Sequence, residues 1–299
     1  MNNQKKLFTI KDLENLSGIK AHTIRIWEKR YNILSPLRND NNIRTYDTHA
    51  LQKLLNIKTL NSFGYKISTI ANFPEEKIPA LVREILSNKT LNSHVVSNFK
   101  LAMMNFDVPL FISTYNTLLA EKSFRDIVYD CFIPLLEEVG ELWQTETITP
   151  IHEHFITQLV KQKIISNIEQ LQAEPPVKTD RIFVLYLPQG EVHDICLTLL
   201  NYELILNGYQ TIYLGTNVPM QSLKQIKDYF DNIAFVTCFT LYPHADEVNK
   251  YIELFKEQIL NDEYSSLHTF GRNSRQITTV PGNERIKSYE TVKEFSEAL

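Results

Sequence analysis

The N-terminal segment shows two short stripes of apolar residues at helical spacing, separated by a glycine turn. The first stripe starts after Thr9, within a Thr-x-x-Asp capping pattern, and stops at Gly18. The second spans about Lys20 to Tyr31 and places Ile24 and Trp27 on one face. Two helices joined by a tight turn predict a helix-turn-helix unit.

The next stretch, residues 36–46, is polar and has an asparagine-rich centre, which favours a β-hairpin. Such a hairpin would form a wing beside the second helix. A further apolar stripe predicts a helix over residues 47–62, and Gly64 is placed to end it. Residues 1–74 are therefore expected to form an all-α winged helix-turn-helix domain.

Residues 75–172 show helical periodicity throughout, interrupted by Pro79, Pro109 and Pro134. A four-helix bundle is the economical arrangement for such a segment. Residues 173–178 are polar and contain two prolines, which indicates a linker between domains.

Beyond this linker, short apolar runs alternate with helical stretches. The predicted strands are 181–187, 211–215, 232–239 and 266–270, and the predicted helices are 194–207, 220–231 and 244–260. This alternation predicts a doubly wound α/β domain with a flavodoxin-like parallel sheet over residues 179–299, whose ligands would lie at the carboxyl ends of the strands. The chain as a whole is expected to be a multi-domain protein.

The composition agrees with a folded chain of this size. Of 299 residues, 43% are hydrophobic and 22% are charged, which excludes a disordered or fibrous protein. No apolar run is long enough to span a membrane and the N-terminus lacks an apolar signal core, so we expect a cytoplasmic protein. The three cysteines are widely spaced, which favours reduced thiols over a structural zinc site.

The charge is unevenly distributed along the chain. Residues 1–72 carry 12 Lys and Arg against 5 Asp and Glu, and the rest of the chain carries 19 against 30. A small basic domain suits a polyanion such as DNA, because cationic side chains neutralise phosphates and release counterions. A chance run of solvated lysines would look the same by charge alone.

One combination of motifs in the basic segment is specific. An opening Thr-Ile, a glycine turn, a Thr-Ile-Arg-x-Trp-Glu helix and a wing ending in Arg-x-Tyr occur in this order within residues 7–72. In this combination the segment resembles the MerR family of winged-helix transcription regulators. The resemblance implies a dimer that binds partly palindromic promoter DNA, with the second helix in the major groove and the wing on the backbone.

The same resemblance implies roles for the polar side chains of this domain. The residues that would face base edges or nearby phosphates are His22, Thr23 and Arg25, and those that would hold the DNA backbone are Arg30, Arg38, Arg44 and Tyr46. The positive charge and the helical spacing permit these roles independently. Ile24 and Trp27 are expected to be buried instead.

The loop after the first strand of the α/β region contains Glu191 and, two residues later, His193. A histidine that ligates a metal commonly donates its other ring N–H to a carboxylate, although a solvated loop histidine is the commoner case. The loop Gly-Glu-Val-His-Asp-Ile-Cys resembles the cobalt-ligand loop of cobalamin-binding domains. Downstream, Cys238 and Thr240 stand where that family has Ser-x-Thr or Ser-x-Leu, and Gly271 stands where it has the second residue of a Gly-Gly pair.

This resemblance implies that His193 is the lower axial ligand of cobalt and that Glu191 is its hydrogen-bond partner. The positions of Cys238, Thr240 and Gly271 belong to the part of the site where the nucleotide tail of cobalamin enters a deep slot. Cobalamin, a corrinoid, is therefore the expected cofactor.

A second match lies in the predicted bundle, where Trp143 is followed after nine residues by Glu153 and His154. This arrangement resembles that of cobalamin-binding photoreceptor repressors of the MerR type, in which it covers the upper face of the cofactor. The resemblance implies that Trp143 shields the upper axial group, with the other two side chains nearby. With this match, the three-part resemblance covers nearly the whole chain.

Four positions depart from the family patterns. Cys196 and Phe270 replace glycines and Cys238 replaces a serine, so three larger side chains belong to the tail slot. Close-packed interiors rarely absorb such volume unchanged, and the slot either still accepts the tail or is packed core. Gln144 replaces the histidine that follows the tryptophan in light-sensing relatives and captures cobalt there, which leaves His152 and His154 of the next helix as its substitutes.

The sequence leaves three classes of function to compare. The leading hypothesis is a transcription regulator that binds operator DNA as a homodimer or higher oligomer, senses a corrinoid and changes its assembly. The alternative is a corrinoid-independent regulator whose C-terminal half only oligomerises or binds a protein antagonist. An enzyme is disfavoured, because we find no substrate barrel or partner catalytic domain in the sequence.

Overall fold

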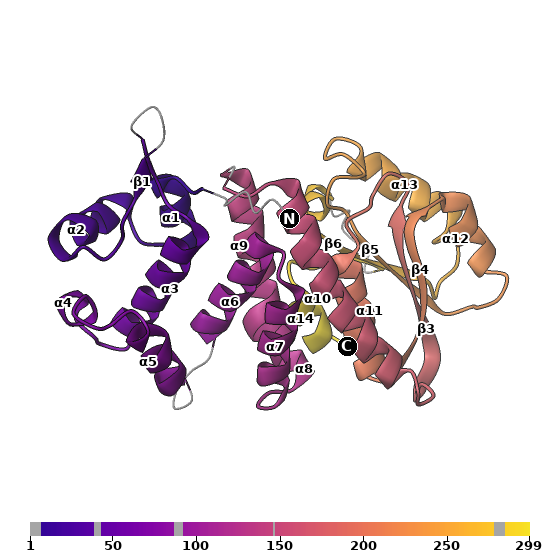
Figure 1. The fold of residues 1–299 in the computed structure, drawn as a ribbon. Helices are drawn as coiled ribbons and strands as arrows, with labels where there is room; N and C mark the ends of the chain where they lie inside the picture. Colours follow the sequence, from indigo (N-terminus) through magenta and orange to yellow (C-terminus); the bar gives the residue numbers. More distant parts are fainter. Residues whose placement is uncertain (1–6, 39–42, 87–91, 146, 278–284) are drawn as a thin grey trace, which may run out of the picture. The chain divides into compact units, whose positions relative to one another are not determined.

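The structure is a computed structural model that describes residues 1–299 except 1–6, 39–42, 87–91, 146 and 278–284 (Figure 1). Contacts within the chain divide it into two compact units, residues 1–159 and residues 160–299. Among the described residues, none of the helices combines the length and the apolar character that a membrane crossing requires.

The first unit begins with the predicted helix-turn-helix. Thr9 and Asp12 form a reciprocal capping box at the start of the first helix, and Gly18 ends it in the left-handed conformation with φ +71°. In sequence order, the elements of this part are α1 (Ile10–Ser17), α2 (Ala21–Tyr31), β1 (Leu37–Arg38), β2 (Arg44–Thr45), α3 (Thr48–Ser62), α4 (Ile67–Ile70) and α5 (Lys77–Leu86).

The predicted wing is present as the antiparallel pair β1 and β2. The asparagine-rich centre of the wing, residues 39–42, lies outside the described residues. Ile24 is fully buried and Trp27 is half-buried, so α2 packs on the domain with the face predicted from its spacing. Helix α5 packs against α3, although its residues were expected to belong to the bundle.

The rest of the first unit is helical, as predicted. Its core contains Phe99, Phe111 and Phe132, whose ring centroids lie 5.0 to 6.4 Å apart. A π-helical turn precedes Pro134, which has no N–H with which to continue the α-helical hydrogen bonds. The elements are α6 (Asn92–Asn105), α7 (Val108–Leu119), α8 (Phe124–Ile127), η1 (Val128–Phe132), α9 (Ile133–Gln144) and α10 (Pro150–Leu171), of which α10 continues into the second unit.

The second unit is the predicted parallel α/β domain. Its five strands are all parallel and stand in the order β4-β3-β5-β6-β7, which is the flavodoxin-like order. The elements are β3 (Lys178–Pro188), α11 (Ile195–Leu206), β4 (Tyr209–Val218), α12 (Met220–Ile226), β5 (Ile233–Cys238), α13 (Val248–Gln258), β6 (Ser266–Phe270), η2 (Arg272–Gln276), β7 (Ile286–Ser288) and α14 (Val292–Glu297). Strand β3 begins within the stretch predicted as a linker.

Helices cover both faces of this sheet (Figure 1). Helices α11 and α14 bury their apolar residues on one face, and α12 and α13 bury theirs on the other. Because β3 leads to α11 and its neighbour β5 leads to α13, the chain leaves these two adjacent strands toward opposite faces. The carboxyl ends of β3 and β5 therefore border the crevice in which ligands bind in open α/β sheets.

Candidate functional site

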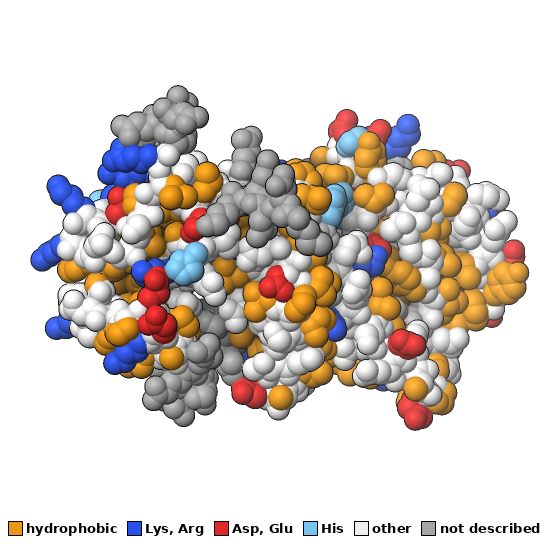
Figure 2. Space-filling model, viewed as in Figure 1, with side chains coloured by type: hydrophobic (Ala, Val, Ile, Leu, Met, Phe, Trp, Pro, Cys, Tyr) orange, Lys and Arg blue, Asp and Glu red, His pale blue; other side chains and the backbone are white. Residues whose placement is uncertain are grey.

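The polar surface of the helix-turn-helix domain carries the predicted basic side chains. His22, Arg25 and Arg30 are exposed on α2, and Arg38 and Arg44 are exposed on the wing, whereas the predicted contact residue Thr23 is half-buried. Figure 2 shows Lys and Arg side chains gathered over the part of this unit where α2 and β1 lie. The structure thus brings the helix and wing residues of the expected DNA contact onto one basic surface.

Glu28 of α2 holds the wing against this helix. Its two carboxylate oxygens accept hydrogen bonds from Nε of Arg44 at 3.0 Å and from the hydroxyl of Tyr46 at 2.7 Å. Tyr46 is fully buried, and burial together with the Glu28 carboxylate raises the pKa of its hydroxyl. Tyr46 therefore serves to position the wing, and the expectation that it grips the DNA backbone is wrong.

A hollow of about 740 Å³ lies between α2 and the start of the wing. Its lining includes the cationic side chains of Arg25, Lys29 and Arg44 together with the carboxylate of Glu28. Cationic side chains of α2 and of the wing therefore line the same hollow.

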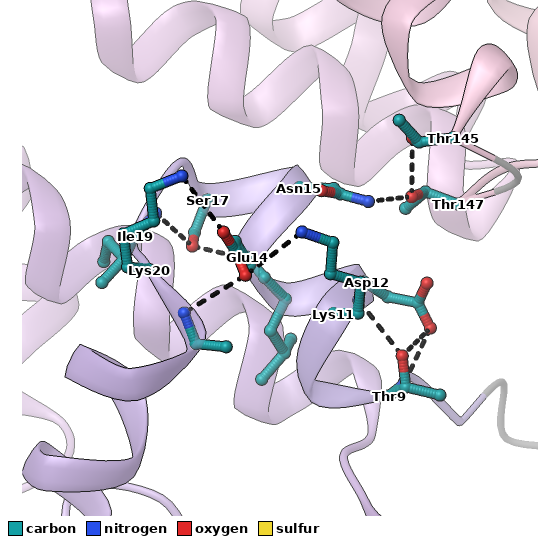
Figure 3. A network of polar contacts seen from close by, with 12 residues as sticks. Thr9, Lys11, Asp12, Glu14, Asn15, Ser17, Ile19, Lys20, Thr145 and Thr147 are labelled. Carbon is teal, nitrogen blue, oxygen red and sulfur yellow. Dashed lines mark hydrogen bonds and ion pairs between the residues drawn. The ribbon is translucent and has the colours of Figure 1, made fainter.

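The helix-turn-helix domain is also tied to the helical part of the same unit. The ammonium group of Lys100 on α6 donates to the backbone carbonyl of Leu16 at 3.0 Å and to the carboxylate of Glu138 on α9 at 2.6 Å. Figure 3 shows a second tie, from the side chain of Asn15 to the hydroxyl of Thr147 at 2.7 Å. Sequence reasoning did not single out these residues, because a lysine is ordinarily expected at the surface.

The side chains expected near the upper face of a corrinoid flank the turn between α9 and α10. Trp143 lies at the end of α9 with 51% of its surface exposed, and His154 is exposed near the start of α10. Glu153 is half-buried beside His154. Ile151, also on α10, is 62% exposed, so this end of the helical region presents large apolar side chains to solvent.

His152 has a structural role in the same turn. It is buried, its Nδ1 lies 2.7 Å from the hydroxyl of Thr149, and its ring stacks on Phe106 with 4.8 Å between centroids. Of the two histidines expected as substitutes at this end of the site, only His154 is accessible from solvent.

In the second unit, Glu191 organises the loops at the carboxyl ends of β3 and β5. One carboxylate oxygen accepts the backbone N–H groups of Val192 and His193 at 2.9 and 3.0 Å. The other accepts the N–H groups of three successive residues, at 3.0, 2.6 and 3.0 Å, from Thr240, Leu241 and Tyr242. Burial raises the pKa of Glu191, but these hydrogen bonds outweigh it and lower the pKa to about 2.

The same carboxylate fixes the imidazole of His193, whose Nδ1 donates to Glu191 at 2.6 Å. A ring that carries its proton on Nδ1 presents the lone pair of Nε2, the form that ligates a metal. The His193 side chain is 42% exposed, so this nitrogen lies at an accessible site. The predicted pairing of the two residues is therefore present.

Large apolar side chains are exposed on the two loops that Glu191 joins. Val192 is 64% exposed, Leu241 is 55% exposed and Tyr242 is 39% exposed. Sequence reasoning missed this apolar rim, because the two loops are distant in the sequence and meet through the pairing of β3 with β5 and the hydrogen bonds of Glu191. An exposed apolar rim next to a histidine suits the broad, flat face of a macrocycle.

The position predicted for a nucleotide tail is filled by the protein. Cys238 and Phe270 are register partners at the ends of β5 and β6, and their exposed fractions are 0% and 2%. The ring of Phe270 stacks on Tyr289 and meets the edge of Phe295, with centroids 5.3 and 5.2 Å apart. Cys196 packs against the same core. Three side chains larger than the family residues thus form close-packed core.

Gly271 and Thr240 contribute through their backbones. Gly271 has φ +90°, and a Cβ atom at this position would lie 2.7 Å from the carbonyl oxygen of Phe239. The glycine is therefore required by the packing of its own chain, whether or not a ligand is bound. Thr240 acts through the N–H group that it donates to Glu191.

The residues of this candidate site fit the macrocycle of a corrinoid but do not fit its nucleotide tail. In the part of the chain that the structure describes, no three His, Cys, Asp or Glu side chains converge as a metal site. A single oriented histidine on an apolar rim suits a metal that brings its other ligands in a macrocycle. The packed layer at Phe270 does not fit an inserted nucleotide tail.

Comparison with known families finds two matching regions in this chain. Residues 8–76 match the model of the MerR HTH family of regulatory proteins, and residues 95–165 match the model of the B12 binding domain. The chain thus carries a region that matches MerR-type helix-turn-helix proteins and a region that matches the B12 binding domain, and a corrinoid is the cofactor class that the second match indicates.

Two curated relatives cover most of this chain, and both come from Myxococcus xanthus. The HTH-type transcriptional repressor CarH is 26% identical over 228 residues, which cover 73% of this chain and 74% of CarH. The HTH-type transcriptional repressor CarA is 23% identical over 217 residues, which cover 72% of this chain and 70% of CarA. This chain is homologous to both repressors.

A solved structure supports the fold. The monomethylamine corrinoid protein of Methanosarcina barkeri aligns with a TM-score of 0.52 and 16% identity, covering 70% of this chain and 98% of that protein. At this identity, the likeness concerns the arrangement of helices and parallel sheet.

Proposed function

We propose that this protein is a transcription regulator whose C-terminal region binds a corrinoid and thereby changes the assembly of the protein on operator DNA. The observation that carries the proposal is the Glu191–His193 pair, in which a buried carboxylate orients an exposed imidazole for a metal. The homology to the repressors CarH and CarA supports a regulatory role over an enzymatic one.

The DNA-binding role is proposed for the basic surface of α2 and the wing. Arg25 and His22 would reach base edges or nearby phosphates from α2, because both are exposed on this helix. Arg30, Arg38 and Arg44 would hold phosphates on either side. Glu28 fixes the wing to the helix before DNA arrives, so less conformational freedom is lost on binding.

The corrinoid role divides between the two units. His193 would hold the cobalt from one side, and Glu191 would keep the proton of the ring on Nδ1. Trp143, Glu153 and His154 of the first unit are proposed as further cofactor-binding residues. When bound, a corrinoid would supply a cobalt centre that can exchange a ligand.

The proposed signal is a shift between oligomeric states with different affinities for DNA. The homodimer and any higher oligomer are part of this proposal, as is the cytoplasmic location of a regulator. Within the first unit, Lys100 connects the last turn of α1 to α9, the helix that contains Trp143. This contact would carry a change at the cofactor site to the DNA-binding domain.

The test uses the full chain. Purified protein is incubated with hydroxocobalamin or with cobinamide, desalted, and examined by visible absorption, by light scattering for its oligomeric state, and by selection of bound duplexes from a random DNA pool. Co-elution of a corrinoid spectrum with a change of mass or of DNA affinity supports the proposal. Retention of neither corrinoid, together with sequence-specific DNA binding, would favour the corrinoid-independent regulator and its protein antagonist.

A further inference from the structure

The packed layer below His193 determines what kind of corrinoid the site can take. A complete cobalamin carries a nucleotide tail on the same face of the ring that His193 would ligate. Such a tail must leave the ring beside the loop that contains His193 and run toward the carboxyl ends of the strands. Helix α11 starts directly after this loop, so the space between α11 and the sheet is the inward path.

This inward path is closed in the described structure. Cys196 lies in the first turn of α11, and Cys238 and Phe270 face it from β5 and β6 within one apolar cluster. Phe270 is held by two aromatic neighbours, Tyr289 and Phe295, and is 2% exposed. Opening the path would require displacing a buried ring whose neighbours are close-packed.

From this arrangement we infer that the protein prefers corrinoids without a nucleotide tail, the cobinamide class, over complete cobalamins. The inference rests on the proposed function. A tail that cannot enter the core must stay over the exposed rim formed by Val192 and Leu241, where it buries little surface.

The chemistry of the tail explains why the site should prefer cobinamide over cobalamin. The base at the end of the nucleotide tail binds the cobalt of free cobalamin, and His193 can ligate that cobalt only by displacing it. A site that buries the tail offsets this displacement with new contacts, whereas a site filled by Phe270 offers none there. Cobinamide has no such base, so it meets His193 without a competitor.

The first experiment needs only the unmodified full chain. Aquocobinamide and hydroxocobalamin are titrated separately and binding is followed by visible absorption and calorimetry. We expect cobinamide to bind at least about tenfold more tightly, with a spectral change that His193→Ala removes. Equal or tighter binding of cobalamin would overturn the inference while leaving the proposed function intact. Binding of neither corrinoid would overturn the proposed function itself.

A matched pair of variants tests the role of the packed layer. Phe270→Ala opens the inward path, and Phe255→Ala removes the same side chain from a fully buried position in the cluster on the other face of the sheet. We expect only Phe270→Ala to narrow the affinity ratio between cobinamide and cobalamin. A folded Phe270→Ala protein with an unchanged ratio would overturn the inference. If Phe270→Ala does not fold, Cys196→Gly, which removes a half-buried side chain, is used instead. An unchanged affinity ratio in that variant would likewise overturn the inference.

Discussion

Replacing Glu191 by glutamine should destabilise the α/β domain strongly. The carboxylate accepts five backbone N–H groups and the ring of His193, and its pKa is lowered from 4.5 to about 2. Each pKa unit corresponds to about 1.4 kcal/mol, so the ionised group stabilises the folded domain by about 3 kcal/mol at neutral pH. Glutamine keeps the shape but loses the charge and one acceptor oxygen. A loss of about 3 kcal/mol is large against the 5–15 kcal/mol that ordinarily stabilises a domain.

The effect of Glu191→Gln should depend on pH in a defined direction. Because the folded pKa is lower than the unfolded one, the stabilisation is complete above pH 4.5 and is lost as the pH falls toward 2. The variant lacks this titration. The difference in unfolding free energy between the two proteins should therefore be greatest at neutral pH and shrink in acid.

Amide hydrogen exchange is the suitable assay. The chain has two tryptophans, Trp27 and Trp143, and both lie in the first unit, so their fluorescence does not report unfolding of the α/β domain. Exchange of the amides in β3 and β5 does. Equal protection of wild type and Glu191→Gln at pH 7 would refute the reasoning. Asp262→Asn tests the same reasoning at a second carboxylate of the domain, because the pKa of Asp262 is also lowered to about 2, by hydrogen bonds with Lys227 and Ser265 that outweigh burial, and this variant should lose protection as well.

Three further predictions concern the first unit. Arg44→Ala should weaken binding to all DNA sequences and reduce the salt slope by about one, as the loss of a phosphate contact does, whereas the exposed Lys224→Ala in α12 should change neither; an unchanged slope removes Arg44 from the interface. Arg25→Ala should cost about 1–3 kcal/mol at particular base pairs in competition assays, and uniform weakening would instead assign it to the backbone. Lys100→Met should lower the unfolding free energy of this unit by about 1–3 kcal/mol, because the buried Leu16 carbonyl loses its donor; tryptophan fluorescence in urea measures this, and an unshifted midpoint contradicts it.

Local signals predicted the secondary structure near the functional regions well. The Thr9 cap and the Gly18 stop act within a few residues of one another, and both are present. The strand predicted over 266–270 has these bounds in the structure. By contrast, the three-residue strand β7 and the short helix α14 have too few residues to show a period, and both were missed.

The candidate site was predictable where it depends on neighbours in sequence. Glu191 and His193 are two residues apart, so their pairing follows from the motif. The bonds from Glu191 to residues 240–242 depend on the parallel pairing of β3 with β5, which the spacing of residues along the chain does not reveal. The burial of Tyr46 and Lys100 was missed for a related reason: amphipathic side chains are exposed unless a specific partner, such as Glu28 or Glu138, compensates them.

The steric demand at Gly271 has a consequence for how such proteins diverge. Since a side chain here would collide with the carbonyl of Phe239, selection for folding alone is enough to retain this glycine. A lineage could stop using a complete cofactor and still carry the glycine indefinitely. The preceding residue, Phe270, is under no such backbone constraint. A change of ligand would therefore appear first as a substitution at this position.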